Sequence, residues 1–301
     1  MTLNLKGVLL PVTTPFNQDE EIDLSGLHRN IGKWNECGVI GYVVLGSTGE
    51  RVNLNEHEYV QVIESARAAT PSQMTFIVGA GQQSTRGTIA EVERASAAGA
   101  QAALVITPNF YKSAITQAAL VTHYTAIADH SSVPIILYSM PDLTGIKIES
   151  ETAARLSEHP NIIALKDSSN DVSNFGKTVR MVAQDFAVMI GNGTVFCEAL
   201  QAGARGGILA VGCAAPELCV EIYGAFQAHQ IDRASELQKK LTPLALAVTK
   251  TYGIGGLKTA MEMAGYVGGE VRAPLRKPSV EARAEISALL AAVTQASEAR
   301  A

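Results

Sequence analysis

Eight short apolar segments alternate along this chain with eight longer segments that have helical periodicity. The short segments have the length of strands and few polar residues, which is typical of parallel strands covered by helices on both faces. Strands are expected at residues 8–11, 41–45, 76–78, 102–106, 135–138, 162–165, 186–190 and 207–211, with helices near 25–36, 55–69, 84–98, 115–129, 150–158, 171–183, 194–202 and 215–228. This order predicts an α/β fold of the closed (β/α)8 TIM-barrel type.

An open doubly wound sheet is the alternative fold. That fold usually has a glycine-rich fingerprint after its first strand, where this chain has residues 12–16, Val-Thr-Thr-Pro-Phe. After about residue 229 the sequence predicts three helices, at 231–251, 257–265 and 279–297, broken by the glycines of 253–256 and by Pro274 and Pro278. We therefore expect a catalytic barrel over 1–229 and a C-terminal helical extension over 230–301 that packs on it.

The composition argues against several classes of protein. Hydrophobic residues make up 47% of the chain, which is enough for a large core and excludes general disorder. There are 24 basic and 29 acidic residues and no basic run, so no nucleic-acid partner is expected. The four cysteines are scattered and the six histidines form no HxH or HExxH pattern, which predicts neither disulfides nor a metal site. The chain has no targeting signal at its start and no long apolar stretch, so we expect a cytoplasmic protein without membrane contact.

Reactive side chains stand where two neighbouring strands are expected to end, and the site of such a barrel lies at that end of its strands. Lys166 is a lone charge after an apolar run, with the side-chain parity of Ile162 and Ala164. If that face points inward, desolvation favours the neutral amine, a nucleophile toward carbonyl carbons. Tyr138 ends the preceding strand and could relay protons. The alternatives are a solvated lysine and a tyrosine that only bridges core and rim.

Other strand ends offer groups that could hold a substrate. The turn after the second strand, Gly46-Ser47-Thr48-Gly49-Glu50, could present backbone N–H groups to a carboxylate, although such turns are common. Tyr111 follows the fourth strand and could be catalytic or could pack at a subunit contact. The stretches Gly191-Asn192-Gly193 and Gly207-Ile208-Leu209 lie at the last two strands, where the glycines could leave room for a substrate or a phosphate.

Together these strand ends resemble the dihydrodipicolinate synthase / N-acetylneuraminate lyase superfamily of Schiff-base aldolases. The resemblance covers about residues 5–215 and the helical tail, with its motifs in family order: 11–16, 46–50, Thr107-Pro108 with Tyr111, 138–141 with Thr144-Gly145, and Lys166-Asp167-Ser168.

The resemblance implies a role for each matching residue. Lys166 forms an imine with the keto carbon of a 2-oxo acid, usually pyruvate, and Tyr138 shuttles protons. Ser47 links Tyr138 to a second tyrosine, Tyr111, which a neighbouring subunit of a homotetramer (a dimer of dimers) supplies. Thr48 and the backbone at Gly46 hold the carboxylate, and the Ile208 backbone contacts pyruvate. Ser168 and Gly191 complete the expected substrate-binding set. No cofactor beyond the lysine imine is implied.

Departures from the family pattern bear on the second substrate. Lysine-pathway synthases carry an arginine where this chain has Leu143, and an alkyl group cannot replace that charged contact. Sialic-acid lyases carry acidic residues where this chain has 191–194, Gly-Asn-Gly-Thr. Other stretches are similar to 4-hydroxy-2-oxoglutarate aldolases, although those carry an asparagine at Thr48.

The leading hypothesis is a carbon–carbon lyase that splits 4-hydroxy-2-oxoglutarate, or a close analogue, into pyruvate and a small aldehyde. The rivals are the dihydrodipicolinate reaction, a deoxy-sugar-acid aldolase or dehydratase, and a non-catalytic paralogue that binds an oxo acid.

Overall fold

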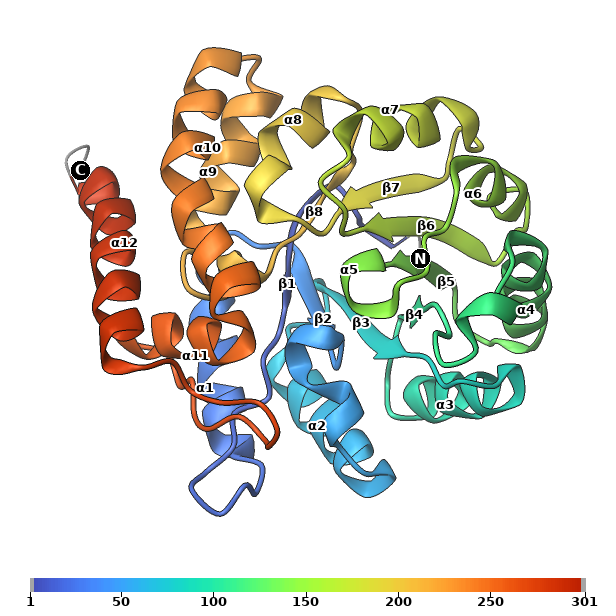
Figure 1. Ribbon diagram of the computed structural model, residues 1–301, viewed down its shortest axis with the longest axis horizontal. Coiled ribbons are helices and arrows are strands. Elements are labelled where there is room, and N and C mark those ends of the chain that lie inside the picture. Colours follow the sequence, from blue (N-terminus) through green and yellow to red (C-terminus); the bar gives the residue numbers. More distant parts are fainter. Residues whose placement is uncertain (1–2, 299–301) are drawn as a thin grey trace.

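The computed structural model describes residues 3–298 and contains the closed parallel barrel that the sequence predicts. Each strand pairs with its neighbours in chain order, and β1 closes the ring by pairing with β8 (Figure 1). The strands are β1 Gly7–Pro11, β2 Gly41–Val44, β3 Thr75–Ala80, β4 Ala102–Ile106, β5 Ile135–Ser139, β6 Ile162–Asp167, β7 Ala187–Ile190 and β8 Gly206–Ile208.

Helices surround the barrel and separate its strands along the chain (Figure 1). They are α1 Leu24–Trp34, α2 Glu56–Ala69, α3 Thr85–Ala97, α4 Gln117–His130, α5 Pro141–Thr144, α6 Ser150–Leu156, α7 Val172–Met181, α8 Phe196–Gln201 and α9 Pro216–Gln227, with short 3-10 turns between them. Several begin at a side-chain cap: Asn55 and Glu58 form a full capping box at α2, and Ser84 caps α3.

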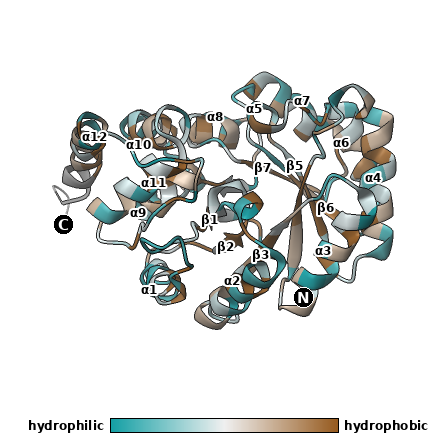
Figure 2. Cartoon of the chain, turned by 60° about the horizontal axis from the view of Figure 1, so that its bottom comes forward, coloured by the Kyte–Doolittle hydropathy of each residue, from teal (hydrophilic) through white to brown (hydrophobic). Residues whose placement is uncertain are grey.

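The core has two layers because alternate side chains of a strand point to opposite faces. The inner layer fills the barrel and includes Leu9, Val43, Ile136, Met189 and Ile208. The outer and larger layer lies between strands and helices. Hydrophobic colouring accordingly follows the strands, whereas the surrounding helices carry both colours (Figure 2). Within residues 3–298, no helix combines the length and the apolar character needed to cross a membrane.

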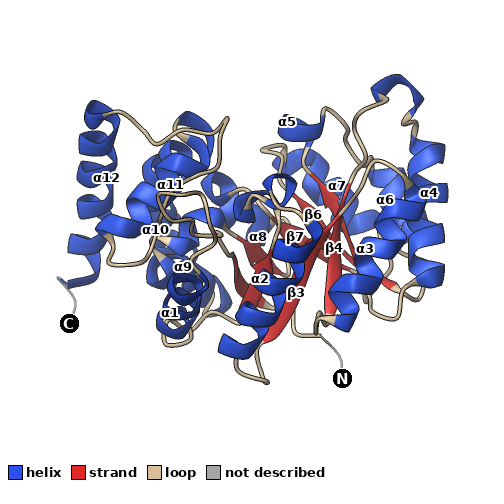
Figure 3. Cartoon of the chain, turned by 90° about the horizontal axis from the view of Figure 1, so that it is seen from below, coloured by secondary structure: helices blue, strands red, loops and turns tan. Residues whose placement is uncertain are grey.

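The segment after α9 consists of helices α10 Ile231–Leu246, α11 Gly253–Met263 and α12 Val280–Glu298, with one π-helical stretch at Ala247–Thr251. These helices lie at one side of the barrel (Figure 3), where α10 packs on α9 and α12 packs on α10 and α11. The sequence predicts a barrel over 1–229 and an extension over 230–301. Residues 1–2 of the first range and 299–301 of the second lie outside the described residues.

Several predicted boundaries differ from the observed ones by a few residues, and two of these differences have a clear physical cause. The last strand ends at Ile208, and Ala210–Cys213 forms a 3-10 turn. Val211, Gly212 and Cys213 of this turn are buried, and the Trp34 indole of α1 donates to the Cys213 carbonyl. An apolar run alone does not distinguish a strand from such a buried turn. Helix α11 begins at Gly253 rather than at 257. A Cβ on Gly255 would lie 2.2 Å from the Arg276 carbonyl oxygen, so this glycine permits close packing and does not interrupt the helix.

Candidate active site

Lys166 stands on β6 beside Tyr138 of β5, at the end of the barrel where the strands terminate. Its side chain lies on the barrel's inner face, and the residue is only 4% exposed. The ammonium nitrogen lies 4.4 Å from the centre of the Tyr138 ring. Among residues 3–298, Lys166 forms no ion pair. A buried amine without a carboxylate partner is suited to act as a nucleophile.

A hydroxyl pair lies next to this amine. The Tyr138 hydroxyl and the Ser47 Oγ are 3.0 Å apart, and either group could donate the hydrogen bond. Tyr138 is buried, and Ser47 comes from the turn after β2, so the contact joins opposite parts of the barrel's mouth. Two hydroxyls in hydrogen-bond contact beside an amine can pass a proton toward it or away from it.

The turn after β2 is an irregular and strained piece of backbone. Ser47–Gly49 forms one 3-10 turn, preceded by Leu45 at φ 59° and followed by Glu50 at φ 55°. Left-handed conformations are unfavourable for non-glycine residues and persist only where the surroundings enforce them. Thr48 is buried, and the Gly49 carbonyl accepts a 2.8 Å hydrogen bond from Thr14. The first N–H groups of such a turn have no partner within it, so they are suited to a carboxylate.

Gly191 and Ser168 adjoin the lysine. A Cβ built on Gly191 would lie 2.0 Å from the Ser168 Oγ and 2.7 Å from the Lys166 Cε. Any side chain at position 191 would therefore displace the lysine. The glycine leaves space for the nucleophile itself, in addition to any space it leaves for substrate.

Ile208 is fully buried at the end of β8 and belongs to the same interior cluster as Tyr138. Five of the nine residues expected at the site are therefore connected by direct contacts or close approaches: Lys166, Tyr138, Ser47, Ser168 and Gly191. Gly46 and Thr48 belong to the same turn as Ser47.

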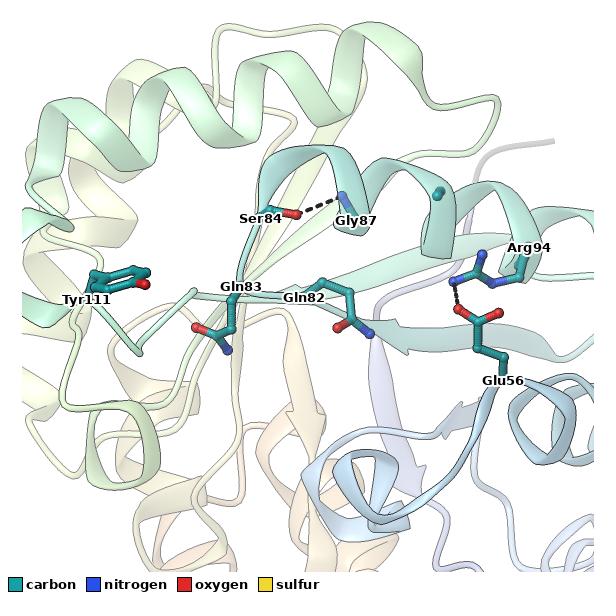
Figure 4. Close-up of a pocket in the computed structure, with 8 residues that line it drawn as sticks. Glu56, Gln82, Gln83, Ser84, Gly87, Arg94 and Tyr111 are labelled. Carbon is teal, nitrogen blue, oxygen red and sulfur yellow. Dashed lines mark hydrogen bonds and ion pairs between the residues drawn. The ribbon is translucent and has the colours of Figure 1, made fainter.

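Tyr111 is placed differently. It is 70% exposed, and its ring packs edge-to-face on Phe110, with 5.0 Å between ring centres. It borders an open groove of about 510 Å³ beside α3, together with Gln83, Ser84 and Arg94 (Figure 4). That groove includes neither Lys166 nor Tyr138. Within the described part of the chain, no hydrogen bond joins Tyr111 to Ser47 or Tyr138. Within the described residues of a single chain, Tyr111 therefore shows no contact with Lys166.

A buried ion pair that was not among the residues expected at the site lies beside the turn. Lys258 of α11 donates to Glu50 at 2.6 Å, and both side chains are 1% exposed. The two residues are 208 positions apart, so no local pattern connects them. The sequence feature that could have indicated the pair is Lys258 itself. It is the single charged residue in a stretch of mostly small and apolar residues, 253–261.

No site for a metal ion is found among the described residues, since no three His, Cys, Asp or Glu side chains there cluster as ligands would.

Comparison with known proteins gives consistent results. The model of the "Dihydrodipicolinate synthetase family" matches residues 4–293. A 4-hydroxy-tetrahydrodipicolinate synthase of Methanothrix thermoacetophila is 34% identical over 286 residues, which cover 95% of this chain and 96% of that protein. The crystal structure of a dihydrodipicolinate synthase from Thermotoga maritima has a TM-score of 0.91 at 30% identity, covering 97% of this chain and 99% of that one.

A third similar protein was crystallised with pyruvate. It is YagE, a prophage protein of E. coli K12 from the dihydrodipicolinic acid synthase family, with a TM-score of 0.91 at 26% identity, covering 96% of this chain and 99% of that one. None of these comparisons supports the expected specificity for 4-hydroxy-2-oxoglutarate; the names of the relatives correspond to the dihydrodipicolinate alternative.

Proposed function

This chain belongs to the dihydrodipicolinate synthetase family, and on that premise we propose that Lys166 condenses with the keto carbon of pyruvate to start carbon–carbon bond chemistry. Enzymes of this family are carbon–carbon lyases or synthases of the class I aldolase type, which work through a covalent lysine–pyruvate imine without an external cofactor. The observation that carries the proposal is the buried Lys166 amine, which lies above the Tyr138 ring and has no ion-pair partner in the described part of the chain.

The chemistry follows from that amine. Its nitrogen attacks the keto carbon, and the resulting carbinolamine loses water to give a protonated imine. The imine withdraws electrons from the adjacent methyl carbon, which loses a proton and becomes a nucleophilic enamine. The enamine carbon then attacks an aldehyde, or the same steps in reverse break that bond.

The neighbouring groups support these steps in our proposal. Tyr138 and Ser47 move the protons that carbinolamine formation and dehydration require, because their hydroxyls are in contact beside the amine. Thr48 and the backbone at Gly46 hold the carboxylate of pyruvate, which fixes the keto carbon in front of Lys166. Ile208, Ser168 and Gly191 shape the space around the reacting carbon.

For the second substrate we propose aspartate semialdehyde first, since the relatives named above are called synthases of 4-hydroxy-tetrahydrodipicolinate. One observation favours a second candidate, the cleavage of 4-hydroxy-2-oxoglutarate. Leu143 of α5 is 59% exposed at the position where the resemblance implies an arginine for the second carboxylate. An isobutyl group cannot make that charge-assisted contact.

The test of the imine is borohydride reduction in the presence of pyruvate, followed by peptide mass mapping. The expected result is a reduced pyruvate adduct on Lys166, absent from a Lys166→Arg variant. A folded wild-type protein without this adduct would indicate the non-catalytic oxo-acid-binding alternative. Turnover of aspartate semialdehyde with pyruvate, compared with 4-hydroxy-2-oxoglutarate and deoxy sugar acids, then selects the second substrate.

A further inference from the structure

The 46–50 turn, defined here as residues Gly46 to Glu50, is held in place by three separate parts of the chain. Thr14, in the loop after β1, donates to the Gly49 carbonyl, and Tyr138 of β5 contacts Ser47. The third part is the C-terminal extension, which reaches Glu50 at the end of the turn.

Both oxygens of the Glu50 carboxylate bond to the extension. Oε1 accepts from the Lys258 ammonium at 2.6 Å, and Oε2 accepts from the backbone N–H of Arg272 at 3.1 Å. Asn53 also donates to Oε2, at 3.3 Å. The Glu50 carboxylate is buried, and both of its oxygens accept hydrogen bonds. A shift of the Glu50 backbone would therefore break charged hydrogen bonds.

Lys258 is itself fixed. Its ammonium also donates to the Glu270 carbonyl at 2.5 Å and lies 4.5 Å from the centre of the Phe16 ring. Glu270 forms an isolated antiparallel β-bridge with Phe16. Gly269, at φ 71°, lies so close to the same residue that a Cβ on Gly269 would be 2.6 Å from the Phe16 carbonyl oxygen. The segment between α11 and α12 is thus seated on the loop after β1, and Lys258 is held from two sides.

A second ion pair strengthens the same connection. The Arg272 guanidinium binds the Glu58 carboxylate of α2, and it also donates to the Asn53 carbonyl at 2.9 Å. This pair fixes Arg272, whose N–H bonds to Glu50, against the helix that follows the turn.

General stability is a weak explanation for the Glu50–Lys258 pair. Burial lowers the pKa of Lys258 to about 8 even though the Glu50 carboxylate opposes this shift, so burial of the ammonium is not fully offset. Buried ion pairs often add no net stability compared with apolar residues of similar size, and in some proteins they instead fix a geometry. Here the geometry concerned is that of the turn carrying Ser47 and Thr48.

We propose that Glu50 and Lys258 are positioning residues, through which the C-terminal extension sets the 46–50 turn for the carboxylate of a 2-oxo acid. The inference rests on the proposed function, because it assigns the carboxylate to this turn. It predicts that loss of the pair weakens binding of pyruvate and leaves the reactivity of Lys166 toward a ketone without a carboxylate unchanged.

The experiment is borohydride trapping at Lys166 with pyruvate and, separately, with acetone. The variant is the double substitution Glu50→Gln with Lys258→Met, which removes both charges together and so leaves no buried charge unpaired. Glu50→Gln alone is the second variant; like the double variant it keeps an acceptor for the Arg272 N–H, but it leaves the Lys258 ammonium buried without its counter-charge, so its fold is checked first by Tm. The control is Ile286→Ala, which truncates a fully buried residue of α12 and so lowers stability within the extension while leaving the Glu50–Lys258 pair in place.

The pyruvate concentration for half-maximal trapping should rise roughly 10-fold in the double variant, the ratio given by one lost charged hydrogen bond. Acetone trapping should stay at the wild-type level, and Ile286→Ala should leave both values unchanged at a similar fall in Tm. An unchanged pyruvate value in a folded Glu50 variant, or an equal rise in Ile286→Ala, would overturn the positioning role alone. Absence of trapping in the wild type would overturn the proposed function and this role together.

Discussion

The space around the Lys166 amine is limited by a single residue on the neighbouring strand end. Gly191 lies where any Cβ would collide with the Lys166 Cε and the Ser168 Oγ. Protein interiors do not absorb such an overlap without displacing a side chain, and a nucleophile must reach its carbon within a few tenths of an ångström.

Gly191→Ala should therefore lower the rate of pyruvate trapping at Lys166 at least about 10-fold, since small misplacements of reacting groups are costly. Peptide mass mapping after a timed borohydride quench measures this rate. The matched control is Gly224→Ala on the exposed side of α9, where an added Cβ meets no atom within 4 Å. That control should gain about 0.5–1 kcal/mol of stability and keep the wild-type rate. Equal rates in both variants would show that position 191 does not constrain the lysine.

At the scale of elements, α3 and α4 are joined by a buried imidazole. The Nδ1 of His123 on α4 lies 2.9 Å from the Thr85 hydroxyl on α3, and its Nε2 is buried without a partner among the described residues. Desolvation lowers the pKa of His123 to about 4 from its ordinary value of 6.5. The folded state therefore keeps the imidazole neutral where the unfolded chain binds a proton.

The sign of the pH dependence follows from linkage. Because the pKa of His123 is lower in the folded state, its full contribution to stability is present above pH 6.5 and is lost as the pH falls toward about 4. The loss amounts to at most about 3 kcal/mol. His123→Leu should flatten the fall in Tm over this pH range, whereas Thr85→Val, which keeps the imidazole, should not. A wild-type slope in the leucine variant would assign the acid sensitivity to other groups.

At the scale of the whole molecule, one chain leaves a large aromatic pair uncovered. Phe110 and Tyr111 are 75% and 70% exposed. Tyr111 borders the groove beside α3 (Figure 4). Aromatic side chains of this size are enriched where proteins meet. This exposure is compatible with the proposal that Tyr111 serves the active site of a neighbouring copy.

Mixing two variants, each expected to have little activity alone, tests that proposal. Lys166→Ala lacks the nucleophile, and Tyr111→Phe lacks the phenol. If Tyr111 acts across an interface, a mixed oligomer contains sites that have Lys166 from one chain and Tyr111 from the other, so activity should return to roughly a quarter of the wild-type level, by random pairing. If Tyr111 acts within its own chain, no mixture recovers activity, and if Tyr111→Phe is fully active the residue has no catalytic part. Light scattering of the mixture reports whether oligomers are present.

The sequence by itself determined the barrel, because the alternation of apolar runs and periodic segments is a local property that burial on both faces imposes on parallel strands. It also indicated Lys166 and Tyr138, because a polar side chain at the end of an apolar strand has one natural place, the mouth of the barrel. Boundaries such as that of β8 were missed where an apolar turn is buried as deeply as a strand.

Only the tertiary structure decided how distant residues meet. The contact of Ser47 with Tyr138 spans 91 positions and depends on closure of the barrel. The contact of Glu50 with Lys258 spans 208 positions and depends on how the C-terminal extension packs on the barrel. Local sequence cannot encode such contacts, because side-chain hydrogen bonds are short-ranged and are fixed only once the backbone brings their atoms within about 3 Å.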